Sequence, residues 1–266
     1  MIADMIIDMH VHTTAYETDF APQIREAEKF DARLVVAVLW PAGHRGEEQY
    51  DVSVELFRDA NRQVLALCDR FPERVRAWIY VNPAHTREAL TELEQGLRYP
   101  AAVGLKLWVA RRASDPCLDP LLELCAAEGV PVLQHTWVKT GGNLPGESTP
   151  EDLRQAALRH PRTTFIMAHC GGDWDYGIKV ARDLPNVYVD ICGGEAMRGW
   201  TERLVSAVGA EWVVFGTDMP GRSFPSQLAK VLGARLSDDD KERILYRNFA
   251  AILQQRRRPG GAPWPA

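Results

Sequence analysis

Residues 5–12 read MIIDMHVH, and the fold prediction starts from this stretch. Its apolar run leads directly into two histidines, His10 and His12, that are separated by one residue. Continuous rather than alternating hydrophobicity is expected of a strand that is buried on both faces, as in a parallel sheet. Because side chains at i and i+2 lie on the same side of a strand, we expect His10 and His12 to point the same way.

Seven more apolar runs rich in Val and Ile follow along the chain. They are RLVVAVLW (33–40), RVRAWIYVN (74–82), AVGLKLW (102–108), VPVLQH (130–135), TTFIMAH (163–169), NVYVDIC (186–192) and WVVFGTD (212–218). Segments with helical periodicity lie between and after them, for example 52–70, 86–98, 118–128, 150–159 and 238–254. Asp51 and Ser237 are predicted N-caps, and Pro150 suits a first helical turn.

Eight strands that alternate with helices in about 250 residues predict a single α/β domain, a (β/α)₈ TIM-type barrel, over residues 1–255. The alternative is an open doubly wound sheet, which usually carries a Gly-rich phosphate turn after its first strand. The segment HVHTTAYETD (10–19) contains no glycine, so the barrel is favoured. Residues 256–266 are predicted to form a Pro/Gly-rich tail.

Composition narrows the class of protein. The chain has 266 residues, 46% hydrophobic and 25% charged, with a formal net charge of −5. This mild acidity argues against a nucleic-acid partner, which needs a concentrated basic face. Five scattered cysteines, an acidic N-terminus and the lack of a long apolar run predict a cytoplasmic protein with no membrane partner. A core of this size needs no metal to fold, so a bound metal is expected to do chemistry.

Polar residues cluster at the predicted strand ends. His10 and His12 end the first strand, His135 the fifth, His169 the sixth and Asp218 the eighth. Because the C-terminal strand ends of a barrel converge on one face, these five side chains are expected to meet there. Imidazoles together with a carboxylate suit Zn²⁺ or Fe²⁺, so the pattern predicts a metal site.

Taken with the order DMHVH, GLKLW, VLQH, FIMAHCGG, VYVDICGG, VFGTDMP and NFAAIL, the chain resembles the amidohydrolase superfamily. Within it, the chain is most similar to the amidohydrolase-2 branch, which includes metal-dependent hydrolases and decarboxylases of the aminocarboxymuconate-semialdehyde type. The resemblance runs from residue 5 to about 253. It implies His10, His12, His135 and Asp218 as metal ligands, His169 as a catalytic group, a small-molecule substrate and a homodimer.

Lys106 departs from the decarboxylase pattern. Three readings stay open: a carbamate that bridges two metals, a cation that pairs with a substrate carboxylate or phosphate, and a structural ion pair. An unmodified ammonium has no lone pair and cannot itself be a ligand. Lys106 favours a hydrolase of a small amide, lactone or ester. The alternatives are a non-oxidative decarboxylase of an unsaturated or aromatic acid and a non-catalytic barrel.

In the expected hydrolytic mechanism, the metal lowers the pKa of its bound water to about 7. Asp218 accepts the proton of that water, and His169 stabilises the oxyanion. Zn²⁺ is the preferred metal, with Fe²⁺ or Mn²⁺ as alternatives, and a carbamylated Lys106 would add a second ion. Each ligating histidine should donate its other N–H to an acceptor that the sequence alone cannot identify.

Substrate contacts are expected from the loops on the catalytic face. The candidates are Trp40, His44, Trp108, Arg111 and Trp137, and the segment TGGNLPGESTP (140–150) is a candidate lid.

Five further residues are expected near the same face. Cys170 and Cys192 are interpreted as small apolar fillers rather than ligands. Asp173, Asp190 and Glu195 are candidates for substrate recognition or ligand orientation, and the sequence does not rank them.

Overall fold

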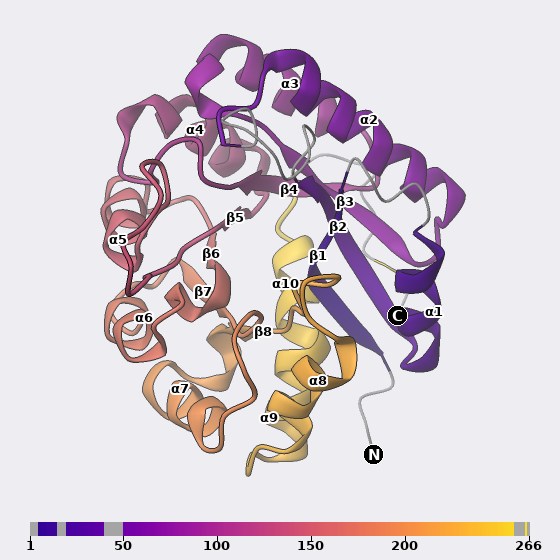
Figure 1. Ribbon diagram of the computed structural model, residues 1–266, viewed down its shortest axis with the longest axis vertical. Helices are drawn as coiled ribbons and strands as arrows, with labels where there is room; N and C mark the ends of the chain where they lie inside the picture. The colour runs from indigo at the N-terminus through magenta and orange to yellow at the C-terminus, as the bar shows by residue number, and fades with distance from the viewer. Residues whose placement is uncertain (1–4, 15–19, 40–49, 258–263, 265–266) are drawn as a thin grey trace.

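A computed structural model describes residues 5–14, 20–39, 50–257 and 264. Eight parallel strands follow one another in chain order around a nearly closed barrel, and the helices surround them (Figure 1). The strands are β1 (Ile6–Thr14), β2 (Ala32–Leu39), β3 (Val75–Tyr80), β4 (Ala102–Leu107), β5 (Val132–Gln134), β6 (Phe165–Met167), β7 (Val187–Asp190) and β8 (Val213–Val214). The predicted (β/α)₈ barrel is therefore confirmed.

The barrel closes between β1 and the segment that follows β8. Met9 N donates to Phe215 O over 3.1 Å, Asp218 N donates to His10 O over 2.8 Å, and His12 N donates to Met219 O over 2.7 Å. These bonds bring Asp218 beside the two histidines of β1, although regular strand geometry in β8 ends at Val214. Closure of the barrel therefore assembles part of the site.

The helices are α1 (Ala21–Lys29), α2 (Val54–Arg70), α3 (Thr86–Gly96), α4 (Asp119–Glu128), α5 (Pro150–Arg159), α6 (Trp174–Ala181), α7 (Trp200–Val208), α8 (Phe224–Leu232), α9 (Asp238–Glu242) and α10 (Asn248–Leu253). Ser237 caps α9 as predicted, and Pro150 lies in the first turn of α5. The predicted cap Asp51 is wrong: Ser53 caps α2, while Asp51 accepts a hydrogen bond from Asn82. No helix among the described residues is long and apolar enough to cross a membrane.

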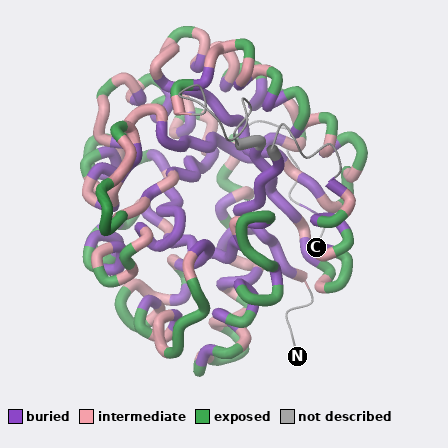
Figure 2. Tube along the Cα trace, in the orientation of Figure 1, coloured by how far each residue is buried: buried purple, intermediate pink, exposed green. Residues whose placement is uncertain are grey.

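Two apolar clusters divide the core, and Figure 2 shows the buried strands inside partly exposed helices. The larger cluster joins the helices to the outer face of the barrel and includes Ile6 and Val11 of β1. The smaller one fills the barrel interior and includes Ile7 and Met9. The pairing of β1 with β2 shifts between Asp8 and Val11. This bulge changes the alternation of β1, so His10 and His12 follow Met9 on the inner side although Val11 faces outward.

A second shift, between Ala77 and Trp78 of β3, places Trp78 opposite Gly104 of β4. Val103 then lies in the inner cluster, whereas Leu105 and Leu107 lie in the outer one. Lys106, between them, is fully buried and points to the inside. Gly104 is required here, because a Cβ would lie 2.2 Å from the Pro131 carbonyl oxygen. The two bulges thus orient functional side chains.

Trp264 connects the tail to the inner cluster. Its side chain is 4% exposed and packs with residues of that cluster, which also contains Phe249 and Ile252 of α10. The Arg76 guanidinium lies 4.9 Å from the centre of its indole ring. The tail thus contributes a large apolar side chain to the core.

Trp264→Ala is expected to reduce the free energy of unfolding by about 3 kcal/mol, because the truncation removes buried apolar area and leaves a cavity. Thermal or urea unfolding measures this loss. Leu158→Ala is the control, because Leu158 is 58% exposed, and its effect should stay within about 0.5 kcal/mol. Equal effects of the two substitutions would contradict the packing of Trp264.

Candidate metal centre

His10 and His12 of β1 meet Asp218 at one end of the barrel. His10 Nε2 lies 3.0 Å from His12 Nε2. Asp218 Oδ1 lies 3.4 Å from His12 Nε2 and 4.0 Å from His10 Nε2. One ligand atom from each of these residues falls within 4.8 Å of the others, so they form a candidate cation site.

His135 and His169 form a second pair beside the first. His135 directly follows β5, and its Nδ1 lies 3.3 Å from His169 Nε2. The rings of His10 and His169 are 5.0 Å apart, so the two pairs are neighbours. His169 lies two residues beyond β6 in a left-handed backbone conformation, with φ 60°. The structure therefore brings together all five residues that the sequence placed at the strand ends.

Each histidine has an outward ring nitrogen with its own partner. His10 Nδ1 lies 2.7 Å from Asp190 Oδ2, and His12 Nδ1 lies 3.4 Å from the carbonyl oxygen of Ala37. His135 Nε2 lies 3.0 Å from Glu147 Oε1, and His169 Nδ1 lies 3.1 Å from Cys192 Sγ. Asp190 was a sequence candidate for orienting a ligand and lies in that position. The other three partners were not identified from the sequence.

Burial makes the imidazoles neutral. It lowers the pKa of His10, His12 and His169 well below the ordinary histidine value, and the positive charge of Lys106 adds to the effect. Burial also lowers the pKa of His135. A neutral imidazole carries one N–H and one lone pair, so the partner of one nitrogen decides the role of the other.

The partners of the outward nitrogens accept hydrogen bonds from them. A backbone carbonyl can only accept, so His12 donates through Nδ1. Glu147 is ionised: burial favours its neutral form, but hydrogen bonds with His135 and Lys139 lower its pKa to about 2. His135 therefore donates through Nε2. Burial raises the pKa of Asp190 to about 6, and its Oδ2 accepts from His10 Nδ1.

The inward nitrogens of His10, His12 and His135 are consequently lone-pair donors. His10 Nε2 lies 3.0 Å from His12 Nε2, and His135 Nδ1 lies 3.3 Å from His169 Nε2. Nitrogen ligands bind transition-metal ions at about 2.1 Å, so two nitrogens 3.0 to 3.3 Å apart can share one ion. The donor set therefore fits a divalent cation that accepts nitrogen and carboxylate ligands.

Lys106 lies directly beside this donor set. Its Nζ is 2.9 Å from His10 Nε2, and its side chain is fully buried. Burial lowers the pKa of Lys106 to about 8, so the amine is still mostly protonated at neutral pH. Burial also raises the pKa of Asp218 to about 7, which suits a group that exchanges a proton near neutrality.

Of the predicted substrate residues that the structure describes, Trp137 contacts the histidine cluster. The Trp137 ring packs edge-on against His169, with centroids 5.0 Å apart, and so borders the cluster. Trp108 is buried with its ring 6.1 Å from that of Tyr50, and Arg111 donates to the carbonyl oxygen of Ala110. Trp40 and His44 lie outside the described residues.

Sequence reasoning did not find Glu147 and gave Cys192 no chemical role. Glu147 is 2% exposed, and it also accepts from Lys139 Nζ over 2.8 Å and from Leu144 N over 3.0 Å. It thereby ties part of the predicted lid segment, 140–150, to His135. A lone acidic residue within a Gly- and Pro-rich loop was the only available signal.

Known proteins share the sequence pattern and the fold of this chain. A profile of the family described as Amidohydrolase matches residues 7–254. No curated protein sequence matches the chain. Among solved structures, 2,6-dihydroxybenzoate decarboxylase from Rhizobium has a TM-score of 0.76 at 14% identity, over 94% of this chain and 98% of that chain.

Two further structures are similar over nearly their whole length. 5-Carboxyvanillate decarboxylase from Sphingomonas paucimobilis has a TM-score of 0.72 at 15% identity, over 94% of this chain and 99% of that chain. A dihydroxybenzoic acid decarboxylase from Polaromonas, with bound manganese and 2-nitroresorcinol, has a TM-score of 0.76 at 15% identity, over 96% and 98%. At these identities the likeness is one of fold.

Proposed function

Because the chain belongs to the amidohydrolase family of enzymes, we propose that it is a metal-dependent, non-oxidative decarboxylase of a small aromatic or unsaturated carboxylic acid. The ammonium of Lys106 beside the donor set carries this proposal. We propose His10, His12, His135 and Asp218 as the cation ligands. Lys106 binds substrate, and His169 lies against the reacting group.

The charge at Lys106 requires an anion nearby. A buried ammonium next to a divalent cation is repelled unless a negative group lies between them. A substrate carboxylate supplies that group and accepts a charge-assisted hydrogen bond from Nζ. A decarboxylase substrate always brings such a carboxylate, whereas a neutral amide or lactone does not. The same residue that favoured hydrolysis in the sequence thus favours decarboxylation in its structural setting.

The relatives support the same substrate class. The similar structures include decarboxylases of 2,6-dihydroxybenzoate and 5-carboxyvanillate, and the dihydroxybenzoic acid decarboxylase from Polaromonas holds manganese. For this chain the imidazole-rich donor set supports Zn²⁺, and the manganese-bound relative supports Mn²⁺. All five cysteines are free thiols, which supports a reducing, cytoplasmic location. The resemblance supports a homodimer.

The reaction is a proton-for-carboxylate exchange. A bound cation supplies Lewis-acid stabilisation of substrate oxygens. Asp218 delivers a proton to the carbon that bears the carboxylate. The carbon–carboxyl bond then breaks, its electron pair returns to the substrate, and CO₂ leaves. Lys106 orients the carboxylate, Trp137 borders the site, and Asp218 regains its proton from solvent.

The test is direct measurement of CO₂ release. The purified protein, supplied with Mn²⁺ or Zn²⁺, is incubated with a panel of hydroxybenzoates and unsaturated acids. Release of one CO₂ per substrate consumed supports the proposal. The matched control is His10→Ala under the same conditions, which should release none. Turnover of lactones or amides in a parallel panel, without any CO₂, would contradict it.

A second candidate function is hydrolysis with two cations. The paired lone pairs of His135 and His169 favour it, because they offer a second ion position beside Lys106. Reaction of the Lys106 amine with CO₂ releases one proton and gives a carbamate, whose oxygens can bridge two ions. Metal analysis and a carbon-13 carbamate signal from labelled CO₂ decide between the candidates: two ions and a carbamate indicate hydrolysis, one ion and a free amine decarboxylation.

Lys106→Met is expected to raise KM for the carboxylate substrate by about 10- to 100-fold, because a charge-assisted hydrogen bond contributes about 1.5–3 kcal/mol. Methionine keeps the apolar length of the lysine stem. Steady-state kinetics of CO₂ release measures the change. Lys179→Met, at an exposed lysine of α6, is the control and should leave KM unchanged. An unaltered KM in Lys106→Met would contradict the substrate-binding role.

A further inference from the structure

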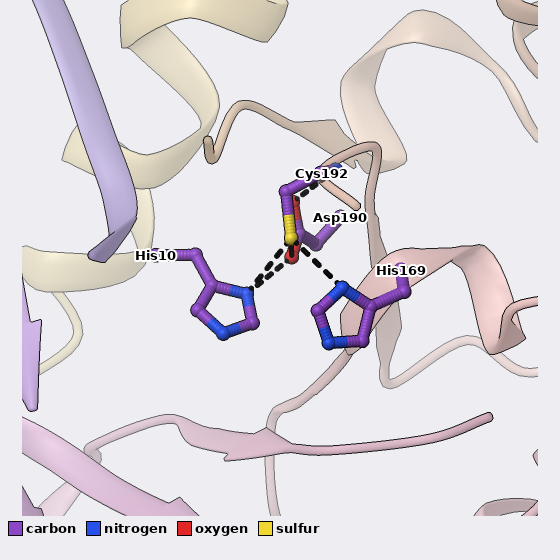
Figure 3. A group of neighbouring side chains, drawn as sticks. All are labelled: His10, His169, Asp190 and Cys192. Atoms are coloured by element: carbon purple, nitrogen blue, oxygen red, sulfur yellow. Dashed lines mark hydrogen bonds and ion pairs between the residues drawn. The ribbon is translucent and has the colours of Figure 1, made fainter. Parts of the chain in front are cut away.

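Cys192 lies between the outward nitrogens of two site histidines. Figure 3 shows its sulfur facing His10, His169 and Asp190. Sγ is 3.0 Å from His10 Nδ1, 3.1 Å from His169 Nδ1 and 2.8 Å from Asp190 Oδ2. All four side chains are buried, with at most 3% exposure. Such a compact buried group must satisfy its polar atoms internally.

The protons of this group can be counted. Lys106 donates to His10 Nε2, so the single proton of His10 sits on Nδ1 and points to Asp190. Asp190 Oδ2 also accepts from the Cys192 thiol. With its own hydrogen used in this way, the sulfur is left as an acceptor for the Nδ1–H of His169. The contacts of Asp190 Oδ2 with His10 and Cys192, and that of the sulfur with His169, then each have one donor and one acceptor. The approach of Sγ to His10 Nδ1 carries no separate hydrogen bond, because both groups direct their protons to Asp190.

We propose that Asp190 and Cys192 are positioning residues that fix His10 and His169 in the tautomer protonated at Nδ1. Both Nε2 lone pairs then point into the cation site. The proposal rests on the proposed function in that these lone pairs serve a bound cation. It therefore adds His169 to the four cation ligands proposed above, as a lone-pair donor, rather than as a proton donor to a substrate oxygen.

The backbone around Cys192 is held in place for this role. Asp190 Oδ1 accepts from Cys192 N over 2.9 Å. Lys230 of α8 donates to the carbonyl oxygens of Ile191 and Gly193, on either side of Cys192. Gly193 has φ 68°, and a Cβ there would lie 2.7 Å from His169 Nδ1. The segment is therefore built to bring the sulfur close to both rings.

The first experiment examines the wild-type protein. Nitrogen-15 NMR of the histidine side chains in the metal-free, full-length protein reports which ring nitrogen carries the proton. We expect Nδ1–H for both His10 and His169, with assignments from His10→Gln and His169→Gln. A spectrum in which His169 carries its proton on Nε2 overturns the proposal. This outcome does not depend on any enzymatic activity.

The second experiment measures Mn²⁺ or Zn²⁺ affinity by calorimetry. Cys192→Ala should weaken binding by about 10- to 100-fold, as expected when the partner of a ligating histidine is lost. Cys192→Ser, which can still donate and accept, should recover most of the affinity. Asp190→Asn should weaken binding as well, because an amide has one acceptor oxygen and one NH₂ donor. It cannot accept from His10, the thiol and Cys192 N together. Cys125→Ala, at a fully buried cysteine of α4, is the control and should bind like the wild type.

Two outcomes overturn the proposal. One is a Cys192→Ala protein that is folded, by its circular dichroism, and binds the cation as tightly as the wild type. The other is a thiolate-to-cobalt charge-transfer band on addition of Co²⁺, because the same four atoms lie within 4.8 Å of one another and the band would place the ion on the sulfur side. A wild-type protein that binds metal but releases no CO₂ contradicts the proposed function alone.

Discussion

Asp218→Asn is expected to lower kcat for CO₂ release by about 100- to 10,000-fold, the usual contribution of a positioned acid–base group. The asparagine keeps the size and the oxygen of the side chain but cannot supply a proton. The carboxyl is well placed for this role, because closure of the barrel brings it within 3.4 Å of His12 Nε2. Steady-state kinetics with saturating cation measures the loss.

The interpretation of Asp218→Asn needs two controls. Metal analysis of the variant separates loss of proton transfer from loss of a ligand, since the histidines remain and the cation should still bind. Asp183→Asn, at a 65% exposed aspartate, should keep full activity. If Asp218→Asn binds the cation and retains its kcat, Asp218 is not the proton donor.

Removal of the cation is expected to reduce activity by at least about 1,000-fold, because Lewis-acid stabilisation contributes several kcal/mol to the transition state. Dialysis against EDTA followed by addition of Zn²⁺ or Mn²⁺ should abolish and then restore CO₂ release. The fold should survive, since two apolar clusters of buried residues hold the barrel together. Circular dichroism before and after dialysis measures this.

Two variants sharpen the metal experiment. His12→Ala removes one proposed ligand and should not recover activity on metal addition at concentrations that restore the wild type. His160→Ala is the matched histidine control, because His160 ends α5, pairs with Asp119 of α4 and lies outside the proposed ligand set. Full activity of the EDTA-treated protein would exclude a metal-dependent reaction of either proposed class.

Much of the fold and the inner part of the site could be predicted from the sequence. The eight apolar runs correspond to the eight strands, because buried parallel strands need continuous hydrophobicity. The five polar residues at their ends converge because barrel topology leaves them no other face. Both inferences depend on patterns within short stretches of chain.

The outer partners could not be predicted in the same way. Cys192 contacts His10 across 182 positions of sequence, and no local pattern distinguishes it from a buried apolar cysteine. Glu147 reaches back 12 positions to His135 from within a loop whose path no periodicity predicts. The bulge in β1 was also invisible, since hydrophobicity alone does not reveal an extra residue in a strand.

The bulge in β1 divides the interior of the barrel into two parts with separate tasks. On its N-terminal side, Ile7 and Met9 belong to the smaller apolar cluster, which fills the barrel interior and includes Trp264. On its C-terminal side, His10 and His12 belong to the candidate metal centre. Substitutions in the loops that follow the strands can therefore change substrate preference, while the apolar cluster inside the barrel continues to stabilise the fold. The register shift between Asp8 and Val11 marks the boundary between the part of the barrel that stabilises the fold and the part that can vary with the substrate.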